Sequence, residues 1–302
     1  MIRCRICGKL GAVSLGKIPD CCVFSGQTIT PSIKGGWLWR CEKCDSMFRH
    51  PTLTSNEYLS LYEKLPASIW DETTENREDF LNIYSYLESH AGGTILDVGC
   101  YTGNFLSGLP GRFQKSGLEP SYSASHYSRS RNIDVLGETL DDLEPNLKFN
   151  IVTSIDVIEH LLNIEEFLDK AMSHVKPNGL LIIGSGDPDA TYWKSLFKSR
   201  YWYCLFPEHV SFPSYKFFCD YAKKNNLQKP ERIRFRYMKL NLSARLAMLL
   251  NQIAFYISPL IYRLVKKTLR MVKNRTSLIK MDDSILVAGL FLDHHIIVFK
   301  KY

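Results

Sequence analysis

The sequence lacks a long apolar run. Its longest uncharged stretch, residues 246–262, is 17 residues long. That stretch also contains polar or helix-breaking residues, namely Asn251, Gln252, Ser258 and Pro259. A helix needs about 20 predominantly apolar residues to cross a bilayer, so we predict no membrane span. The opening residues, Met-Ile-Arg-Cys-Arg, also lack the apolar centre of a secretory signal. We therefore expect a cytoplasmic protein.

Acidic residues are almost absent from one segment. The formal net charge of the chain is +7, but residues 231–280 hold twelve Lys or Arg and the single acid Glu231, a local charge of +11. The rest of the chain therefore carries a charge of −4. A general nucleic-acid binder would not need its charge concentrated in this way. The distribution argues against a nucleic-acid partner.

The composition suits a globular protein. The chain has 302 residues, of which 45% are hydrophobic and 23% are charged. These values fit one large domain with an appendage, or two domains. Nine cysteines without a signal sequence indicate a reducing compartment, where cysteines serve as metal ligands or buried thiols.

Four of these cysteines form two Cys-x-x-Cys pairs. Cys4 and Cys7 make the first pair, and Cys41 and Cys44 make the second, with 33 residues between them. Two such pairs supply four thiolates for a tetrahedral site, which zinc favours. Four protein ligands would close the coordination sphere, so we expect a structural zinc in a small ribbon domain. The alternative is four unrelated buried cysteines.

Residues 94–106 combine an apolar run, an acid and a glycine-rich turn. The run ends near Asp97, Gly99 and Gly103 follow, and the next residues can begin a helix. Strand, glycine turn and helix in this order make room for a nucleotide-like ligand at the carboxyl end of a strand. Glycines there let the backbone approach the ligand closely. Tyr101 stands where a dinucleotide-binding turn has its middle glycine.

The pattern Asp-x-Gly-x-x-x-Gly resembles class I S-adenosylmethionine-dependent methyltransferases. The resemblance implies a central Rossmann-like sheet and S-adenosylmethionine as cofactor. It also implies that the cofactor contacts the turn residues Asp97, Gly99, Cys100, Tyr101 and Gly103. Asp97 and the backbone of Gly99 would lie at the methionine end of the cofactor.

A second strand is predicted over 113–118, and Glu119 follows it. This acid lies about 20 residues beyond the glycine turn, where Rossmann-like folds keep a carboxylate for ribose hydroxyls. A carboxylate can accept both vicinal hydroxyls at once, so we expect Glu119 to bind the ribose. After a third strand over 133–136, the resemblance implies that the main chain and an acid meet the adenine ring. Leu140 and Asp141 align best with those two contacts.

The remaining strands complete the expected sheet. Apolar runs predict strands over 149–154, 180–184, 284–292 and 296–300. A helix is predicted over 163–175, before the stop signal Lys-Pro-Asn-Gly. The last two strands would form an antiparallel hairpin, with His294 and His295 on the surface at its turn. Five strand–helix units and a hairpin match the sheet of the methyltransferase class.

Asp156, Glu159 and His160 lie near the start of the predicted helix. Their spacing of i, i+3 and i+4 places all three on one side. The segment resembles quinone-biosynthesis O-methyltransferases, in which such a cluster can bind a divalent ion that lowers the pKa of a phenol. The alternative is that Glu159 and His160 only orient the helix and the cofactor. We take Asp156 as a cofactor contact and His160 as a catalytic candidate.

His209 follows an aromatic-rich stretch over 192–206 and lies in the sequence Pro-Glu-His-Val-Ser-Phe. A Glu-His-aromatic segment at this place resembles the acceptor loop of sugar-modifying methyltransferases. A neutral imidazole near the donor methyl is a suitable base for a hydroxyl or an amine, so His209 is the second catalytic candidate. The alternative is a buried histidine with both nitrogens satisfied.

Residues 190–280 form a long insert before the predicted hairpin. Apolar residues recur at helical spacing over 246–265, and basic residues follow them. A substrate lid of two helices, broken near Pro259, is the plainest interpretation. An amphipathic helix over 242–275, resting on the inner face of an anionic membrane, is the alternative. RNA binding, oligomerisation or attraction of a phosphorylated substrate also stay open.

The sequence thus predicts an α/β protein with a seven-stranded Rossmann-like methyltransferase sheet. We expect a zinc ribbon over 1–50, connecting helices over 51–90, a core over 91–189 and 281–302, and a helical acceptor insert over 190–280. Cysteine pairs ahead of such a core resemble deoxysugar C-methyltransferases. Those enzymes have a further C-terminal domain, and we therefore expect O- or N-methylation of a sugar, a nucleotide-sugar or a glycan building block. The acceptor would be a small molecule or a glycan precursor.

Three alternatives remain for the function. The first is an RNA methyltransferase whose zinc ribbon binds RNA, although the base-methylating tetrapeptide Asn/Asp-Pro-Pro-aromatic is missing where Ser-Ile-Asp-Val stands at 154–157. The second is an O-methyltransferase of the quinone type. The third is a cofactor-binding scaffold without turnover, whose ribbon recruits partners. The sequence does not indicate an oligomeric state.

Overall fold

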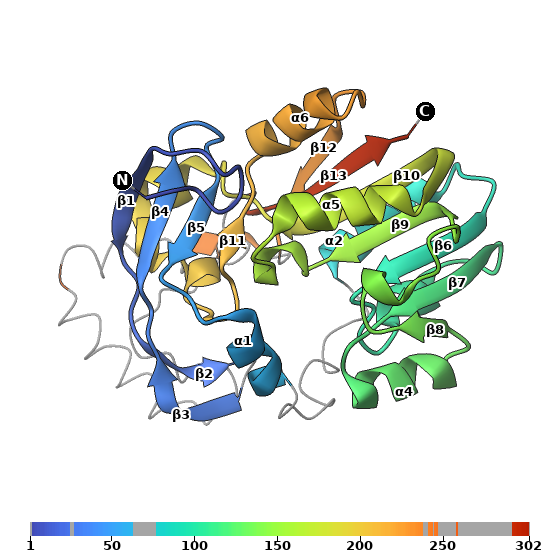
Figure 1. Ribbon diagram of the computed structural model, residues 1–302, viewed down its shortest axis with the longest axis horizontal. Coiled ribbons are helices and arrows are strands. Elements are labelled where there is room, and N and C mark those ends of the chain that lie inside the picture. Colours follow the sequence, from blue (N-terminus) through green and yellow to red (C-terminus); the bar gives the residue numbers. More distant parts are fainter. Residues whose placement is uncertain are drawn as a thin grey trace.

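The computed structural model describes residues 2–24, 27–62, 77–237, 241–243, 245–246, 258 and 292–301. Within these ranges the chain builds a seven-stranded sheet, a four-stranded sheet and a two-stranded sheet (Figure 1). Among the helices described, none combines the length and the apolar character that a bilayer crossing requires.

The seven-stranded sheet confirms the predicted fold class. Its strands are β6 (Gly93–Val98), β7 (Phe113–Leu118), β8 (Asp134–Gly137), β9 (Phe149–Ile155), β10 (Val175–Gly186), β12 (Glu231–Phe235) and β13 (His294–Lys300). They lie in the order β12-β13-β10-β9-β6-β7-β8. β13 runs antiparallel to both of its neighbours, while β6 to β10 are parallel. The carboxyl ends of the parallel strands therefore meet at one edge, where ligands bind in open α/β sheets.

Helices cover both faces of this sheet, as its composition requires. The helices are α2 (Glu78–Leu87), α3 (Asn104–Gly108), α4 (Tyr122–Ser130), α5 (Ile164–Ser173) and α6 (Tyr215–Lys224). Along β6, Ile95 packs with α2 and α3, while Leu96 packs with α5 and α6 on the opposite face. Both side chains are fully buried. A strand with apolar residues on both faces is stable only between two helical layers.

The strand paired with the last strand differs from the prediction. β13 pairs with β12, whereas most of the predicted partner 284–292 lies outside the described residues. β12 was missed because residues 190–280 were predicted to form a helical insert, whereas its sequence, Glu-Arg-Ile-Arg-Phe, suits a charged sheet edge. The predicted insert over 190–280 is revised accordingly, since α6 and β12 belong to the layers of the core. The predicted helices over 246–265 lie almost wholly outside the described residues.

The expectation that His294 and His295 lie on the surface is wrong. Both are buried in β13, between β10 and β12. In the sequence, residues 293–295 (Asp-His-His) resemble a polar turn. In the structure, His294 begins β13, which lies between β10 and β12. Burial here comes from the sheet order, which local polarity does not reveal.

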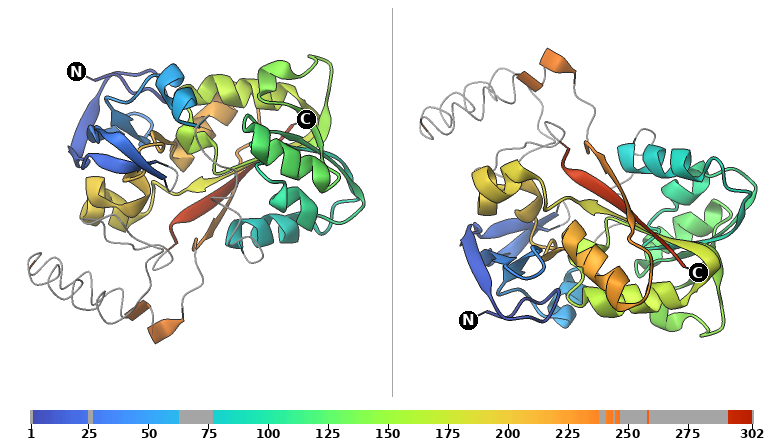
Figure 2. Two further views of the ribbon diagram at one scale, coloured as in Figure 1. Left: turned by 90° about the horizontal axis from the view of Figure 1, so that it is seen from below. Right: turned by 90° about the horizontal axis from the view of Figure 1, so that it is seen from above.

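The N-terminal module packs on the core instead of standing apart. Its strands are β1 (Ala12–Lys17), β2 (Cys21–Phe24), β3 (Gln27–Ile33), β4 (Trp37–Cys41) and β5 (Met47–His50), followed by α1 (Ser55–Tyr62). β5 pairs with the short strand β11 (Ser211–Phe212), which completes the four-stranded sheet. Both views of Figure 2 show these strands beside the yellow segment that precedes β11. The module therefore supports the loop that carries His209.

Candidate active site and cysteine cluster

The predicted glycine turn follows β6 and has a left-handed backbone at three residues. Gly99, Tyr101 and Gly103 have φ values of 78°, 48° and 77°, in the left-handed region that favours glycine. A Cβ at Gly99 would lie 2.5 Å from Cγ2 of Val157, and one at Gly103 would lie 2.2 Å from Cδ1 of Ile133. Packing within the protein thus requires both glycines, independently of any approach to a ligand. Cys100 is buried beneath the turn.

Asp97 is a buried carboxylate at the end of β6. Its side chain is 3% exposed, and Oγ1 of Thr153 donates a 2.6 Å hydrogen bond to Oδ1. Burial raises the pKa of Asp97 to about 7, and Glu119 contributes in the same direction, while Thr153 and Arg77 oppose the shift. No cation lies within ion-pair distance of Asp97 among the described residues. A cationic ligand would favour its charged form.

Glu119 links the ends of the first two parallel strands. Oε2 accepts a 2.9 Å hydrogen bond from the backbone N–H of Tyr101, and Oε1 accepts a 2.8 Å bond from that of Ser121. Burial raises the pKa of Glu119, while the two N–H groups lower it. Two oxygens offer about four acceptor positions, so the carboxylate keeps capacity for ribose hydroxyls.

The two residues expected at the adenine ring differ in their surroundings. Leu140 lies in the 3₁₀ turn η2 (Leu140–Asp142), and its side chain packs in the core. The side chain of Asp141 is 69% exposed and forms a 2.7 Å ion pair with Lys170 of α5. The side chain of Asp142 accepts hydrogen bonds from the backbone N–H groups of Glu138 and Thr139, each at 2.8 Å. This loop is thus held by Asp142, a residue that the sequence analysis did not single out.

Arg77 is a site residue that sequence reasoning missed. It precedes α2 and forms ion pairs with Asp79 and with Asp156, the residue after β9. Asp156 has a φ of 53°. Burial opposes the charge of Arg77, but Asp156 and Asp79 raise its pKa well above the ordinary value. A basic residue at a helix N-terminus opposes the helix dipole, and this conflict is the signal that could have drawn attention to it.

Glu159, His160 and His209 lie together, whereas Asp156 is not in this group. One side-chain donor atom from each of the three lies within 4.8 Å of the others, a spacing that a metal ion could bridge. However, Oε1 of Glu159 accepts a hydrogen bond from the hydroxyl of Tyr203, and Oε2 accepts a 3.2 Å bond from that of Ser185. Burial raises the pKa of Glu159 to about 8. The carboxyl oxygens thus have protein partners without a cation.

The two histidines form an edge-on pair. The ring centroids of His160 and His209 are 4.9 Å apart. Nδ1 of His209 lies 2.8 Å from the carbonyl oxygen of Tyr203, so Nδ1 carries the hydrogen and Nε2 the lone pair. Burial lowers the pKa of His160 to about 4 and that of His209 well below its ordinary value. Both imidazoles are therefore neutral at pH 7.

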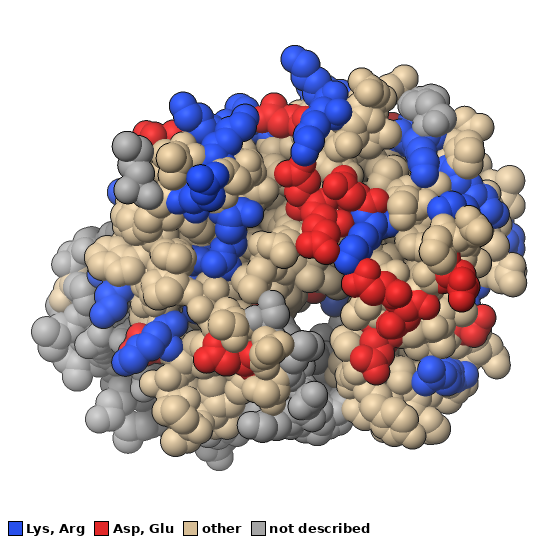
Figure 3. Space-filling view, in the orientation of Figure 1, with Lys and Arg blue, Asp and Glu red and all other residues tan. Residues whose placement is uncertain are grey.

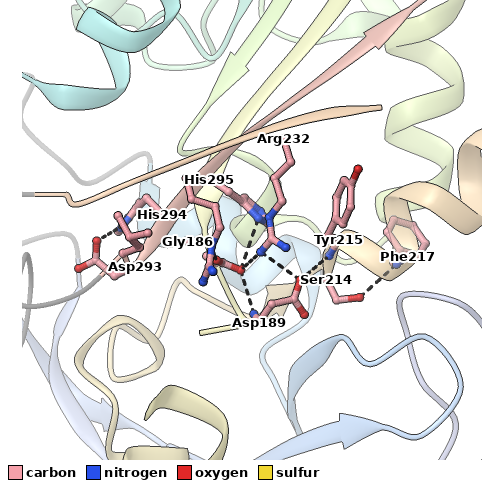
Figure 4. A network of polar contacts seen from close by, with 12 residues as sticks. Gly186, Asp189, Ser214, Tyr215, Phe217, Arg232, Asp293, His294 and His295 are labelled. Carbon is pink, nitrogen blue, oxygen red and sulfur yellow. Dashed lines mark hydrogen bonds and ion pairs between the residues drawn. The ribbon is translucent and has the colours of Figure 1, made fainter. Parts of the chain in front are cut away.

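A buried ion-pair network holds β10, β12 and β13 together. Asp187 forms ion pairs with Arg232 and Arg234, and Asp189 pairs with Arg232 at 3.1 Å. Figure 4 shows Arg232 and His295 converging near Gly186, with Asp293 and His294 next to them. The network thus fixes the carboxyl ends of β10 and β12, next to which His294 lies.

The four predicted metal ligands come together in the N-terminal module. The Sγ atoms of Cys4 and Cys44 are 3.8 Å apart, and those of Cys7 and Cys41 are 3.7 Å apart. All four sulfurs lie within 4.8 Å of one another. A tetrahedral zinc with bonds of about 2.3 Å would separate its sulfurs by about 3.8 Å. The cluster therefore has the dimensions of a tetrathiolate zinc site.

The cysteine cluster is tied to α6. The hydroxyl of Ser214 donates a hydrogen bond to the carbonyl of Cys44 and accepts a 3.1 Å bond from the N–H of Phe217, which caps α6 (Figure 4). The hydroxyl of Ser46 accepts a 3.0 Å bond from the N–H of Ser214. Because α6 packs on the core sheet, these hydrogen bonds connect the cysteine turns to the core.

Comparisons with known proteins identify the family of the chain. The model of a family described as a methyltransferase domain matches residues 73–231, more than half of the chain. A ubiquinone biosynthesis O-methyltransferase of Rickettsia akari (strain Hartford) is 34% identical over 98 residues, which cover 30% of this chain and 39% of the relative. One from Rickettsia bellii (strain OSU 85-389) is 29% identical over 152 residues, covering 44% and 63%. The chain thus spans about two fifths to three fifths of these relatives.

Among solved structures, the N-methyltransferase NodS from Bradyrhizobium japonicum WM9, in complex with S-adenosyl-L-homocysteine, is 14% identical, with a TM-score of 0.49. The match covers 81% of this chain and 97% of that chain. From the matched family model, the chain belongs to the methyltransferase domain family, whose class I members depend on S-adenosylmethionine.

Proposed function

We propose that this protein transfers the methyl group of S-adenosylmethionine to a hydroxyl oxygen of a ring-bearing acceptor, most simply a phenol. The observation that carries the proposal is the cluster of Tyr203, Glu159, His160 and His209 at the carboxyl edge of the sheet. Aromatic walls suit a flat ring, and the polar groups among them suit a hydroxyl. The relatives named ubiquinone biosynthesis O-methyltransferases also support this acceptor class.

The residues at the glycine turn fit the cofactor chemically. S-adenosylmethionine supplies an activated methyl group on a positively charged sulfur. Asp97 would hold the cationic methionine part, since a positive charge favours the ionised form of this buried acid. Glu119 would accept the ribose hydroxyls while it keeps the turns at Tyr101 and Ser121 in place. The protein then mainly aligns the acceptor oxygen with the methyl carbon.

His209 and His160 would line the acceptor side. Nε2 of His209 offers a lone pair, because Nδ1 faces the carbonyl of Tyr203. The sequence predicts that both histidines are catalytic candidates, with His209 as the proton acceptor. Their lowered pKa values favour a neutral hydrogen-bonding role in positioning the hydroxyl. Glu159 would orient this wall through Tyr203.

Sugar methylation is the second acceptor class, and it rests on two resemblances, that of the loop around His209 and that of the N-terminal cysteine pairs. An assay with labelled S-adenosylmethionine separates the two classes, using 3,4-dihydroxybenzoate as the catechol probe and methyl α-D-glucopyranoside as the sugar probe. We expect label on an oxygen of the catechol. Label on the sugar alone would overturn the phenolic assignment, and label on neither probe would overturn both.

We also propose that the four cysteines hold a structural zinc. The sulfur spacing supports this assignment. Four thiolates leave no open position for a substrate, so the metal would stabilise the module and, through Ser214, α6. We further propose a small-molecule acceptor and a cytoplasmic location.

The charge distribution supports the absence of a nucleic-acid partner. Figure 3 shows acidic side chains gathered over the region of α5 on the face seen there. Glu165, Glu166 and Asp169 of α5 belong to this region. Acidic side chains repel a phosphate backbone. The proposed membrane contact over 242–275 lies mostly outside the described residues and remains a proposal.

A further inference from the structure

His294 is a buried histidine with one ring nitrogen unaccounted for. It is 2% exposed, and its Nδ1 lies 3.2 Å from Oδ1 of Asp293. Nε2 has no hydrogen-bond partner among the residues that the structure describes. A buried imidazole nitrogen without a partner is costly. Proteins usually keep such an unpaired nitrogen where it takes part in a reaction.

The position of His294 in the sheet is that of an active-site residue. In the register of β13, His294 lies opposite Gly186, the last residue of β10, and opposite Phe235, the last residue of β12. Because β13 is antiparallel, its first residue lies at the carboxyl edge of the parallel strands. The ring of His294 is 5.2 Å from that of Tyr203 and stacks on that of Tyr237 at 4.6 Å. His294 and His209 therefore both contact the ring of Tyr203, and we call these three residues the aromatic wall.

Asp293 is held so that it can orient the imidazole. Its Oδ1 also accepts a 2.7 Å hydrogen bond from the N–H of Tyr237. Its backbone carbonyl accepts a 2.8 Å bond from the N–H of Asp187, which anchors it to the buried network (Figure 4). With Nδ1–H donated to Asp293, the lone pair of neutral His294 is on Nε2. This is the arrangement of a general base with an orienting carboxylate.

The electrostatic surroundings distinguish His294 from the other two histidines. Burial alone would lower the pKa of His294, but Asp293 raises it above the ordinary value, with further contributions from Asp156 and Asp79. His160 and His209 have lowered pKa values instead. The titratable groups around His294 are Asp293, Asp156, Asp79, Glu159, Tyr203, Tyr237, His209 and His295. Among the histidines of this wall, His294 is the strongest base.

We propose that the Asp293–His294 pair accepts the proton that the acceptor hydroxyl releases during methyl transfer. This inference rests on the hydroxyl acceptor proposed above. The acceptor oxygen forms a bond to the methyl carbon as the carbon–sulfur bond breaks, and the electron pair of that bond stays on sulfur. The hydroxyl proton passes to Nε2 of His294, and Asp293 stabilises the resulting imidazolium. The proton then leaves to solvent when the methylated product departs.

Three variants test the assignment with 3,4-dihydroxybenzoate and labelled S-adenosylmethionine. At saturating S-adenosylmethionine, His294→Gln should lower kcat by roughly a hundredfold or more and abolish the loss of kcat at low pH, while the affinity for S-adenosylmethionine stays within about twofold. Asp293→Asn should shift that loss of rate to lower pH, because the carboxylate that raises the pKa of His294 is gone. His174→Gln is the matched control, since His174 is also buried but caps the far end of α5.

The competing base is tested by His209→Gln. We expect a higher KM for the catechol with the pH profile retained. If His209→Gln removes the loss of rate at low pH while His294→Gln leaves rate and pH profile unchanged, the proposal is overturned in favour of His209. Unchanged affinity for S-adenosylmethionine shows that each variant folds.

A measurement without an acceptor separates failure of this inference from failure of the proposed function. If the wild type labels neither the catechol nor the sugar probe, the proposed function fails. ¹⁵N NMR of labelled histidine then still tests the pair. The pKa of His294 should fall in Asp293→Asn, and an unchanged titration would overturn the pairing.

Discussion

The hydroxyl of Thr153 donates a 2.6 Å hydrogen bond to the buried carboxylate of Asp97. This bond joins the neighbouring strands β9 and β6 just before the glycine turn of Gly99 and Gly103. It lowers the pKa of Asp97, yet burial outweighs it and leaves a pKa of about 7. A group that titrates there would give the proposed cofactor site a pH dependence.

The affinity for S-adenosylmethionine should rise with pH through about 7, since only the ionised form of Asp97 attracts the cationic cofactor. Calorimetric titrations at pH 6 and pH 8 should differ by on the order of tenfold, the limit for one proton near pH 7. Asp97→Asn should bind more weakly and lose most of this dependence. Glu159→Gln is the control for the other buried acid, with a pKa of about 8. An equal pH dependence in Asp97→Asn would contradict the role of Asp97.

The same titration affects the stability of the free protein, in the opposite direction. The folded state holds a proton on Asp97 up to about pH 7, whereas the unfolded chain releases it near the ordinary value of 3.8. The unfolded state therefore binds fewer protons in this window, and this group makes the free energy of unfolding fall as pH rises from about 4 to about 7. The fall should disappear in Asp97→Asn, which urea unfolding at several pH values can measure.

Glu119→Ala should weaken the binding of S-adenosylmethionine about 10- to 100-fold. The variant loses the ribose acceptor and leaves the N–H groups of Tyr101 and Ser121 without their carboxylate. Glu144→Gln, a change of an exposed acid, is the control. Calorimetry gives the affinities. Thermal unfolding shows how much of the lost affinity comes from destabilised turns at Tyr101 and Ser121. Wild-type affinity in Glu119→Ala would remove the ribose role.

Cys41→Ser should abolish stoichiometric zinc and lower the unfolding temperature, because three thiolates hold zinc less tightly than four. Cys22→Ser is the matched control, since Cys22 is exposed and lies between the two pairs. Metal analysis by mass spectrometry and a melting curve decide the outcome. Zinc retained at wild-type level in Cys41→Ser would refute the tetrathiolate site.

Arg49→Met should destabilise the fold by about 2–4 kcal/mol. The buried guanidinium donates hydrogen bonds to the carbonyls of Cys204 and Phe206, at 2.6 and 2.9 Å, and so fastens the loop before His209 to β5. Arg40→Met is the control, because Arg40 forms a part-exposed ion pair with Asp45, a kind worth under about 1 kcal/mol. Urea unfolding measures both changes. Equal losses in the two variants would show that the buried contacts of Arg49 add nothing.

Local sequence signals predicted the features that depend on nearby residues. The strand over 113–118 is reproduced as β7, and the predicted glycine turn at Gly99 and Gly103 follows β6. The cysteine spacing predicted the cluster, because each pair occupies one tight turn. Each of these signals lies within a short stretch of sequence: an apolar pattern, a glycine pair or a cysteine pair. It can therefore be recognised without knowledge of the fold.

Features that depend on distant segments escaped the sequence analysis. β11 has two residues, and only its pairing with β5 makes it a strand. His294 looked exposed because its neighbours are polar, whereas its burial follows from the insertion of β13 between β10 and β12. Arg77 gains its role from Asp156, which lies after β9 and far along the chain. Sheet order and long-range ion pairs carry no local signature.

Hydrogen exchange with and without S-adenosyl-L-homocysteine locates the cofactor. The site described here predicts that bound S-adenosyl-L-homocysteine slows exchange in residues 97–103 and 119–121, where Asp97, the glycine turn and Glu119 meet. It predicts smaller changes in β1 and β4 of the N-terminal module. Protection confined to that module, or none at all at saturating ligand, would contradict a cofactor site at the ends of β6 and β7.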